Sequence, residues 1–529
     1  MKIHQIPFQK TGYFSKIVCD YLDKKNELLE FYENFPDISG FKNQIKLKSG
    51  FKNQKREVLV GALTNQYESF ELSEETQTNI NNLSKSNTYT ITTGHQLNIF
   101  TGPLYFLYKI VSTINLTKTL KTQFPKYNFV PVYWMATEDH DFEEINYFNF
   151  NDSKIKWNRE SSGAVGRLKN DGFEDVFKEF SKRIGNSNDA KYLKELFKNS
   201  YLKYENLTDA TRYLVNELFG ADGLVIIDGD DALLKDQFKP LVKDELFNGT
   251  SFKEVSKTNS ILQKEYKIQV NPREINLFYL TNAIRERIIF KENKYVINNT
   301  KLSFSEDEII DELSKHPDRF SPNVIMRPLY QETILPNLCY IGGGGELAYW
   351  FQLRQYFDKV NTVFPILLLR NSAILASSKQ LEKLERLNIS IEELFCKQGS
   401  LIDKKVKETS EINIDFSSQR TFLTQQFDML EDVATKTDSS FIGAVKAQKK
   451  KQLKGLDNLE KRLLKAEKRK LVDEVQRMKT LQNELFPNYS LEERTRNFSE
   501  YYLKLGKDLV PLLMKALDPL SLEFTIIEY

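Results

Sequence analysis

Short apolar runs rich in β-branched residues alternate with helix-period stretches through the first 376 residues. The runs lie at about 88–93, 129–136, 223–228, 338–341 and 364–370, at intervals that suit βα units rather than hairpins. Continuous apolar segments of this kind are typical of parallel strands that helices cover on both faces. The pattern therefore predicts an α/β fold whose core is an open parallel sheet.

The hydrophobic pattern changes twice along the chain. Between 236 and 317 it predicts short polar helices and a hairpin that turns at Glu292 and Asn293, and from 377 to about 506 helix formers dominate. The expected organisation is a core in two parts, 1–235 and 318–376, an inserted connective α/β region at 236–317, a helical coiled-coil domain at 377–510, and a C-terminal segment at 511–529 that returns to the core.

Two helices with apolar stripes are predicted in the helical domain, at 421–434 and about 445–485. In the second, Leu456, Leu459 and Leu463 follow coiled-coil spacing, and the stripe continues further on after a phase shift. A polar turn between the helices indicates an antiparallel hairpin or coiled coil. Such a seam is too apolar to stay exposed on a helix of about 60 Å, and the first helix is too short to cover it. We therefore expect a homodimer through this region.

Charge and composition exclude several classes of protein. The chain has 529 residues, room for about three domains, with 75 Lys or Arg against 73 Asp or Glu. Its formal charge of +2 creates no strong field toward nucleic acid or anionic lipid. The 445–485 helix is locally basic but lacks aromatic residues that stack on bases. A solvated coiled-coil face is therefore favoured, and no nucleic-acid partner is expected.

The cysteines and the apolar runs indicate the compartment. Cys19, Cys339 and Cys396 lie far apart without CxxC spacing, which disfavours a zinc ribbon and a disulfide framework. The first residues lack the apolar core of a signal peptide, and no run approaches the roughly 18 apolar residues that span a bilayer. We expect a cytoplasmic protein without a membrane partner.

The first candidate site segment is TYTITTGHQLNIFTGPLYFLYK, in which a strand ends at Thr93 and a loop leads to a helix near Pro103. Thr101 or Gly102 can cap that helix, and the backbone amides of its first turn can bind an anion. TTGH, ending at His95, also fits the TxGH pattern of nucleotidyltransferase-like enzymes, in which the histidine lies over a triphosphate. The alternative is an ordinary turn with a loop histidine.

The second segment is VPVYWMATEDHDFEEIN, in which an apolar strand runs directly into an acidic cluster around His140. Ligands of open α/β sheets collect beyond the carboxyl ends of the strands, where this cluster and the first loop both emerge. A histidine flanked by carboxylates can act as a general base or belong to a hard-metal site. The alternative is an acidic helix N-terminus. We predict a catalytic role for His140, Asp141 and Glu144.

The third segment is VIMRPLYQETILPNLCYIGGGGELAYWFQL, with four glycines at 342–345 between a short strand and a helix opened by Glu346. Such a turn lets a ligand approach the backbone. It is neither a dinucleotide fingerprint nor a P-loop, which disfavours an NAD site and a Walker ATPase. Arg327 can clamp a carboxylate or phosphate, or else form a surface ion pair.

Together the three segments resemble the cysteine ligases of bacillithiol biosynthesis, the BshC family. The resemblance extends through FPILLLRNSA and the helical hairpin, over essentially the full length, and EDHDFEE is distinctive. His95 stands where the family more often has glutamine, which disfavours a mechanism that depends on this histidine. Gly344 stands where proline is common.

The resemblance implies a Rossmann-like core, connective insertions and a coiled-coil homodimer. It also implies addition of L-cysteine to glucosaminyl malate, with an amide formed between the sugar amine and the cysteine carboxylate. A carboxylate is a poor acyl donor, so ATP or ADP is the candidate cofactor, although the resemblance leaves the direct activator open. No metal is expected.

This reaction suggests roles for particular residues. The malate carboxylates need cations, for which Arg327, Arg370 and Lys109 are nearest to the three segments. The sugar ammonium must lose a proton, which His140 with its acidic neighbours can take. The predicted substrate-binding residues are Thr93, Gly94, His95, Gln96, Gly102, Tyr105, Lys109, Glu138, Asp139, Asn146, Arg327, Gln331, Glu332, Gly343, Gly345, Glu346, Tyr349, Trp350 and Arg370.

Two other function classes stay open at this point. One is a coiled-coil binding protein whose α/β core senses a nucleotide or sugar. The other is a metal-dependent amide hydrolase that acts through EDHD. The hydrolase is disfavoured because the chain has four histidines and no HExxH motif.

Overall fold

The computed structural model describes residues 2–529, and a parallel five-stranded sheet forms the centre of its core. Each neighbouring pair of strands is parallel, which confirms the predicted α/β core and its five strands. The strand order is β13 (Ile366–Leu369), β12 (Asn337–Gly342), β2 (Thr88–His95), β3 (Asn128–Met135) and β6 (Val225–Asp228).

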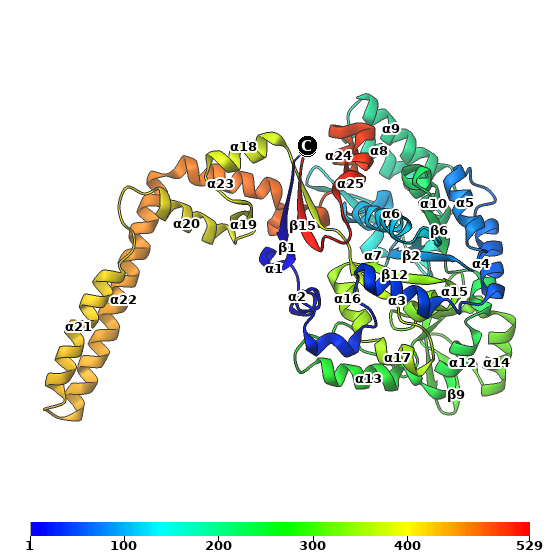
Figure 1. Ribbon diagram of the computed structural model, residues 1–529, viewed down its shortest axis with the longest axis horizontal. Coiled ribbons are helices and arrows are strands. Elements are labelled where there is room, and N and C mark those ends of the chain that lie inside the picture. Colours follow the sequence, from blue (N-terminus) through cyan, green and yellow to red (C-terminus); the bar gives the residue numbers. More distant parts are fainter. Residues whose placement is uncertain (1) are drawn as a thin grey trace.

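Helices pack around this sheet, as Figure 1 shows. All eight residues of β2 are buried, as is every residue of β3 after Asn128. Helix α6 (Tyr105–Gln123) contacts both strands, and α3 (Ile38–Lys48) packs against β12. The apolar strands are thus covered on both faces, which is the environment that continuous apolar runs favour.

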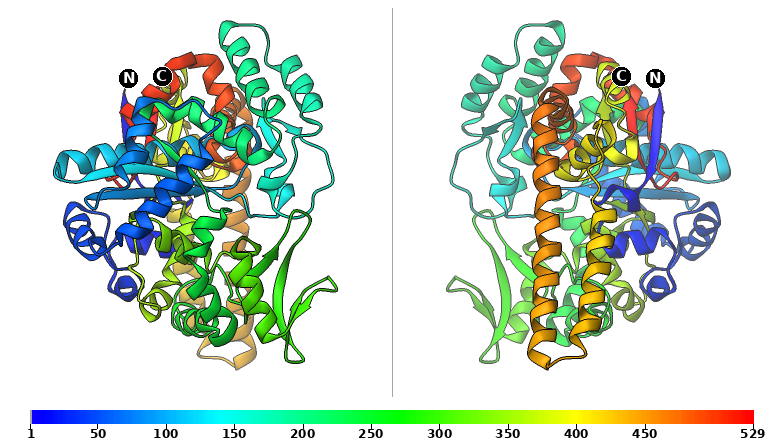
Figure 2. Two further views of the ribbon diagram at one scale, coloured as in Figure 1. Left: turned by 90° about the vertical axis from the view of Figure 1, so that its right-hand side faces the viewer. Right: turned by 90° about the vertical axis from the view of Figure 1, so that its left-hand side faces the viewer.

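Two insertions extend from the core between its strands, and Figure 2 shows them beside each other. Between β3 and β6 the chain forms the hairpin of β4 (Tyr147–Phe150) and β5 (Ser153–Lys156), followed by helices. The sequence pattern did not distinguish this segment from the core, because its strands are only four residues long.

The second insertion contains an antiparallel sheet in the order β10-β9-β8-β7-β11. Its β8–β9 hairpin turns at Glu292 and Asn293, as predicted, and both residues have positive φ, as a tight hairpin turn requires. The strands are β7 (Leu277–Leu280), β8 (Arg285–Lys291), β9 (Lys294–Ile297), β10 (Ser303–Phe304) and β11 (Phe320–Pro322).

A helical arm follows the core. Helices α21 (Ser417–Ala434) and α22 (Ser439–Lys470) lie side by side and project away from the rest of the molecule in Figure 1. The prediction of one helix over 445–485 is wrong. The helix breaks at Leu471, whose φ of −96° and ψ of 32° are not helical, and α23 (Val472–Leu485) follows.

The last strand of the chain lies beside its first strand in a three-stranded sheet. Strand β15 (Glu523–Glu528) pairs antiparallel with β1 (Ile3–Pro7) and parallel with β14 (Ala373–Ala376). Both ends of the chain therefore belong to one small sheet at the base of the arm. Within residues 2–529, no helix combines the length and apolarity that crossing a membrane requires. The exact domain boundaries stay predictions.

Candidate active site

A cavity of about 750 Å³ lies at the carboxyl edge of the parallel sheet, a size typical of small-molecule sites. Residues 94–96 at the end of β2, 138–140 after β3 and 343–346 after β12 all line it. Residues of the second insertion line it as well. The structure therefore brings the three sequence segments together around one cavity, where ligands of open α/β sheets bind.

The predicted site residues divide into two groups by position. Those that line the cavity are Gly94, His95, Gln96, Tyr105, Lys109, Glu138, Asp139, His140, Arg327, Gly343, Gly345, Glu346, Tyr349 and Arg370. Those that do not are Thr93, Gly102, Asp141, Glu144, Asn146, Gln331, Glu332 and Trp350.

Most residues of the second group support the fold. The Thr93 hydroxyl donates to the Ile341 carbonyl at 2.8 Å and joins β2 to β12. Trp350 is fully buried. Glu144 is exposed, and its carboxylate accepts a hydrogen bond from Gln96 at 2.8 Å. Asp141 is exposed as well. These contacts hold the cavity wall in place without facing a ligand.

The start of α6 does not form the anion site that the sequence predicts. The helix begins at Tyr105, with Leu104 at the N-cap position, later than expected. Thr101 and Gly102 do not cap it, because both lie before that position with positive φ. The Leu104 N–H donates to the Arg496 carbonyl at 2.7 Å, so it is not available to a ligand.

The glycine turn after β12 does present backbone to the cavity. Helix α16 (Gly344–Phe351) begins there, earlier than predicted, with glycines 343–345 in the cavity wall. The Glu346 carboxylate accepts from the Gly343 N–H at 2.8 Å and lies 2.6 Å from the Lys109 ammonium. Burial alone would raise the pKa of Glu346, but the ion pair with Lys109 and the hydrogen bonds from the Gly343 N–H and the Tyr340 hydroxyl together lower that pKa. Glu346 is therefore an ionised anchor of the turn.

Basic side chains outnumber acidic ones seven to three in the cavity wall. Three of the basic residues were predicted from the sequence. The other four were not, because they come from the second insertion and from the segment after the arm. The excess favours an anionic ligand. The basic residues are Lys109, Arg273, Arg285, Arg287, Arg327, Arg370 and Arg494, and the acidic ones are Glu138, Asp139 and Glu346.

Buried N–H groups without a partner among residues 2–529 belong to four of these arginines, Arg327 and Arg370 of the core and Arg285 and Arg287 of the second insertion. The Arg327 Nη1 donates to Gln331 at 3.0 Å, whereas its buried Nη2 has no acceptor among the described residues. The Arg370 Nη2 donates to Glu493 at 2.7 Å, but its Nε is likewise unsatisfied. A buried donor without an acceptor costs about 1–3 kcal/mol, which a bound anion would recover.

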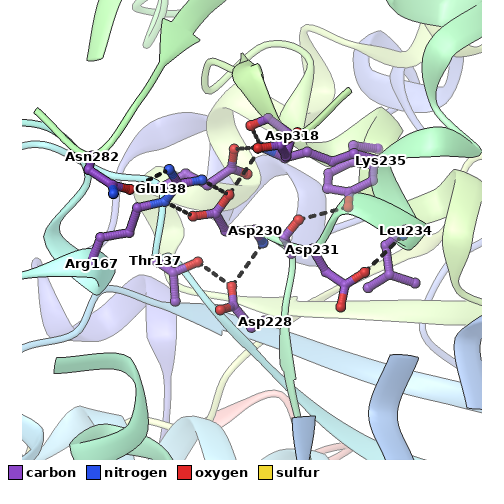
Figure 3. Close-up of polar contacts among 12 residues, drawn as sticks. Thr137, Glu138, Arg167, Asp228, Asp230, Asp231, Leu234, Lys235, Asn282 and Asp318 are labelled. Atoms are coloured by element: carbon purple, nitrogen blue, oxygen red, sulfur yellow. Dashed lines mark hydrogen bonds and ion pairs between the residues drawn. The ribbon is translucent and has the colours of Figure 1, made fainter. Parts of the chain in front are cut away.

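A network of buried charges lies beneath Glu138, as Figure 3 shows. The Lys235 ammonium lies 2.5 Å from Glu138 and 3.4 Å from Asp230, and Arg167 forms two further bonds to Asp230. Burial raises the pKa of Glu138, and Lys235 offsets only part of that rise. For Asp230, the same burial is outweighed by Lys235 and Arg167, so its pKa is lowered. Of the carboxyl groups in this network, Glu138 therefore both lines the cavity and has a raised pKa.

His140 lies at the rim with 52 % of its side chain exposed. Its Nδ1 is 2.6 Å from Nη1 of Arg285, and a guanidinium can only donate. Nδ1 therefore accepts, and the other ring nitrogen of a neutral His140 carries the hydrogen. In this arrangement His140 offers a ligand a hydrogen-bond donor.

His95 is buried beside Tyr105 and Phe106, with ring centroids 5.5 and 5.2 Å away. Burial lowers the pKa of His95 well below its usual value, with Lys109 and Arg370 adding to the effect. The ring is neutral, and its buried Nε2 has no partner within residues 2–529. His95 therefore shapes the cavity wall as an uncharged group.

Two family models match the chain from end to end. "Bacillithiol biosynthesis BshC, N-terminal Rossmann-like domain" matches residues 1–371, and "Bacillithiol biosynthesis BshC, C-terminal coiled-coil domain" matches residues 373–529. This chain belongs to the BshC family. The matches confirm the predicted family, the Rossmann-like core and the coiled-coil domain of this BshC chain.

Curated BshC relatives align over nearly the whole chain. Those from Flavobacterium johnsoniae and Flavobacterium psychrophilum are each 58% identical, over 523 and 526 residues, with 99% of both chains covered. One from Christiangramia forsetii is 55% identical over 535 residues, which cover 100% of this chain and 99% of the relative. All three carry the name "Putative cysteine ligase BshC".

Proposed function

We propose that this protein joins L-cysteine to glucosaminyl malate and thereby forms the amide bond of bacillithiol. Membership in the BshC family and the cysteine-ligase name of its relatives support the reaction. The structural observation that carries the proposal is the predominantly basic cavity at the end of the parallel sheet, with buried arginine N–H groups that lack partners. Such a cavity suits two substrates that both carry carboxylates.

The glycine turn and Arg327 form the part of the cavity suited to the acyl donor. A helix N-terminus made of glycines lets an anion approach backbone N–H groups closely, and Arg327 adds a free donor beside it. We place the cysteine carboxylate here, together with the group that activates it. ATP is the proposed source of activation, because a free carboxylate does not acylate an amine.

Glu138 is the proposed acceptor of the proton that the sugar ammonium loses. Its carboxyl lines the cavity and makes an ion pair with Lys235 but accepts no other hydrogen bond within residues 2–529. Its raised pKa makes it a stronger base than an ordinary glutamate. His140, the base predicted from sequence, has Nδ1 occupied by Arg285, and it serves instead as a donor to the substrate.

The arm is the proposed site of homodimerisation. Six large apolar side chains along α21 and α22 are between 46 and 66 % exposed, which is unusual on a surface that faces only water. A cytoplasmic location is also proposed, since all three cysteines are free, as a reducing compartment favours. The exposed apolar residues include Phe422, Met429, Leu430, Val433 and Leu459.

Turnover by the purified protein tests the proposed function. The full chain is incubated with glucosaminyl malate and L-cysteine, with and without ATP, and bacillithiol is measured by mass spectrometry after thiol labelling. We expect product, a large loss in Arg327→Gln, and full activity in Arg477→Gln, an exposed arginine of α23 outside the cavity. Binding of the sugar without product under any condition would favour the alternative of a sugar-sensing protein.

A further inference from the structure

Three arginines of the second insertion line the cavity. Arg285 and Arg287 belong to β8, and Arg273 lies in the loop before β7. Throughout residues 2–529, no carboxylate lies within 4.0 Å of any of these three guanidinium groups. The buried Nε atoms of Arg285 and Arg287 have no acceptor either. This wall therefore carries positive charge that no carboxylate pairs with directly. Asp139, Glu138 and Asp230 act on Arg285 only from beyond ion-pair distance.

The two strand arginines face the same way, and Arg285 is held in place by contacts with an aromatic ring and a histidine. Alternate residues of a strand share one face, with α-carbons about 7 Å apart, so Arg285 and Arg287 present two adjacent forks to the cavity. The Arg285 guanidinium lies 4.1 Å from the centre of the Phe278 ring and 2.6 Å from His140. These contacts orient the charge without cancelling it.

Two of the three cations predicted from the sequence to bind the malate carboxylates are already paired with protein carboxylates. Lys109 is already paired with Glu346 at 2.6 Å, and Arg370 with Glu493 at 2.7 Å. Either would have to share its charge with a protein carboxylate in order to bind a substrate carboxylate. Arg285 and Arg287 need no such exchange.

We infer that Arg285 and Arg287, with Arg273 beside them, form a subsite for a four-carbon dicarboxylate, the malate portion of the sugar substrate. Each guanidinium fork takes one carboxylate, and bidentate pairing fixes the orientation of the sugar. The inference rests on the proposed function and adds that different parts of the cavity bind the two substrates. The inserted sheet holds the malate end, while Arg327 and the glycine turn hold the acyl donor.

Binding measured by calorimetry on the full-length protein tests this subsite. The titrants are glucosaminyl malate, glucosamine, which lacks the malate, and ATP. The variants are Arg285→Gln and Arg287→Gln, with Lys291→Gln at the far end of the same strand as a matched control. We expect each arginine variant to bind glucosaminyl malate at least about 30-fold more weakly, since a desolvated charge pair is lost. Glucosamine and ATP should bind all variants as they bind the wild type.

Several results would overturn the inference. Arginine variants that keep wild-type affinity for glucosaminyl malate would exclude the subsite, and variants that lose ATP alone would assign these arginines to phosphate. Wild-type protein that does not bind glucosaminyl malate would overturn the proposed function and the subsite with it. Arg285→Lys keeps the positive charge but loses the bidentate guanidinium. If this variant binds glucosaminyl malate with intermediate affinity and has the wild-type melting temperature, the weaker binding reflects a lost contact and not misfolding.

Discussion

At the scale of single residues, burial distinguishes the members of the EDHD cluster and leads us to propose Glu138 as the proton acceptor. Glu138 is 9 % exposed and has a raised pKa, whereas His140 lies at the rim and Asp141 is exposed and does not line the cavity. The sequence located the cluster correctly at the end of a strand. It could not show which of the four side chains is best placed to accept a proton, because this depends on contacts with Lys235 and Arg285, which are distant along the chain.

Replacing Glu138 by glutamine should remove the proton acceptor and keep its size. We expect kcat to fall on the order of 100- to 10,000-fold, with a smaller loss in His140→Ala. Because burial raises the pKa of Glu138, wild-type kcat should increase with pH through a limb above about 4.3, the usual glutamate pKa. Steady-state rates from pH 5 to 9 measure both effects. A Glu138→Gln enzyme with the wild-type kcat and acid limb would exclude this role.

Glu492 should make stability depend on pH. Burial raises the pKa of Glu492 to about 7, although hydrogen bonds from Tyr501 and the Leu375 N–H oppose the rise. The unfolded chain, with a pKa near 4.3, releases this proton earlier, so the stabilisation is complete below about pH 4 and is lost as pH rises through 7. Glu492→Gln cannot titrate. Melting temperatures of the two proteins should therefore diverge between pH 4 and 7, and parallel curves would contradict the assignment.

At the scale of elements, the apolar pattern of the sequence predicts the strands, whereas the ends of the helices depend on tertiary contacts. The five parallel strands were predicted because each contains a short run dense in apolar or β-branched residues. The break at Leu471 was visible only as a phase shift in the apolar stripe, which is also compatible with a single longer helix. The start of α6 could not be predicted, because the partner of the Leu104 N–H is Arg496, at the other end of the chain.

A buried ion pair links α3 to helix α15 (Arg327–Ile334), which carries a cavity arginine. Lys48 lies 2.8 Å from Glu332, both almost fully buried, and Gln331 joins Glu332 to Arg327. Lys48→Met should lower the free energy of unfolding by about 3–5 kcal/mol, because an unpaired carboxylate stays buried. The double variant Lys48→Met/Glu332→Gln should recover most of that loss in urea titrations. A single variant as stable as wild type would show that the pair contributes little.

At the scale of the whole molecule, the cavity is assembled from segments that the sequence separates. The core supplies the three recognised loops, the second insertion supplies Arg285, and Arg494 follows the arm. Local patterns identify elements and motifs, so the first contribution was predictable. The other arginines stand in segments without a motif, and only the fold brings them to the same cavity.

Leu459 should be part of the dimer contact along the arm, where it is 53 % exposed. Leu459→Asp places a charge in the apolar seam and should convert a dimer into monomers at micromolar concentration. Asn458→Asp adds the same carboxylate at the adjacent exposed position and should leave the dimer intact. Light scattering coupled to size exclusion measures the mass. A monomeric wild-type protein, or a dimer that survives Leu459→Asp, would contradict the proposed interface.

Thiol profiling of a strain that lacks this protein tests the central claim most directly. The ligase account predicts that glucosaminyl malate accumulates and bacillithiol disappears, and that the wild-type gene restores bacillithiol while the Arg327→Gln gene does not. Bacillithiol and glucosaminyl malate at parental levels in the deletion strain would contradict the account.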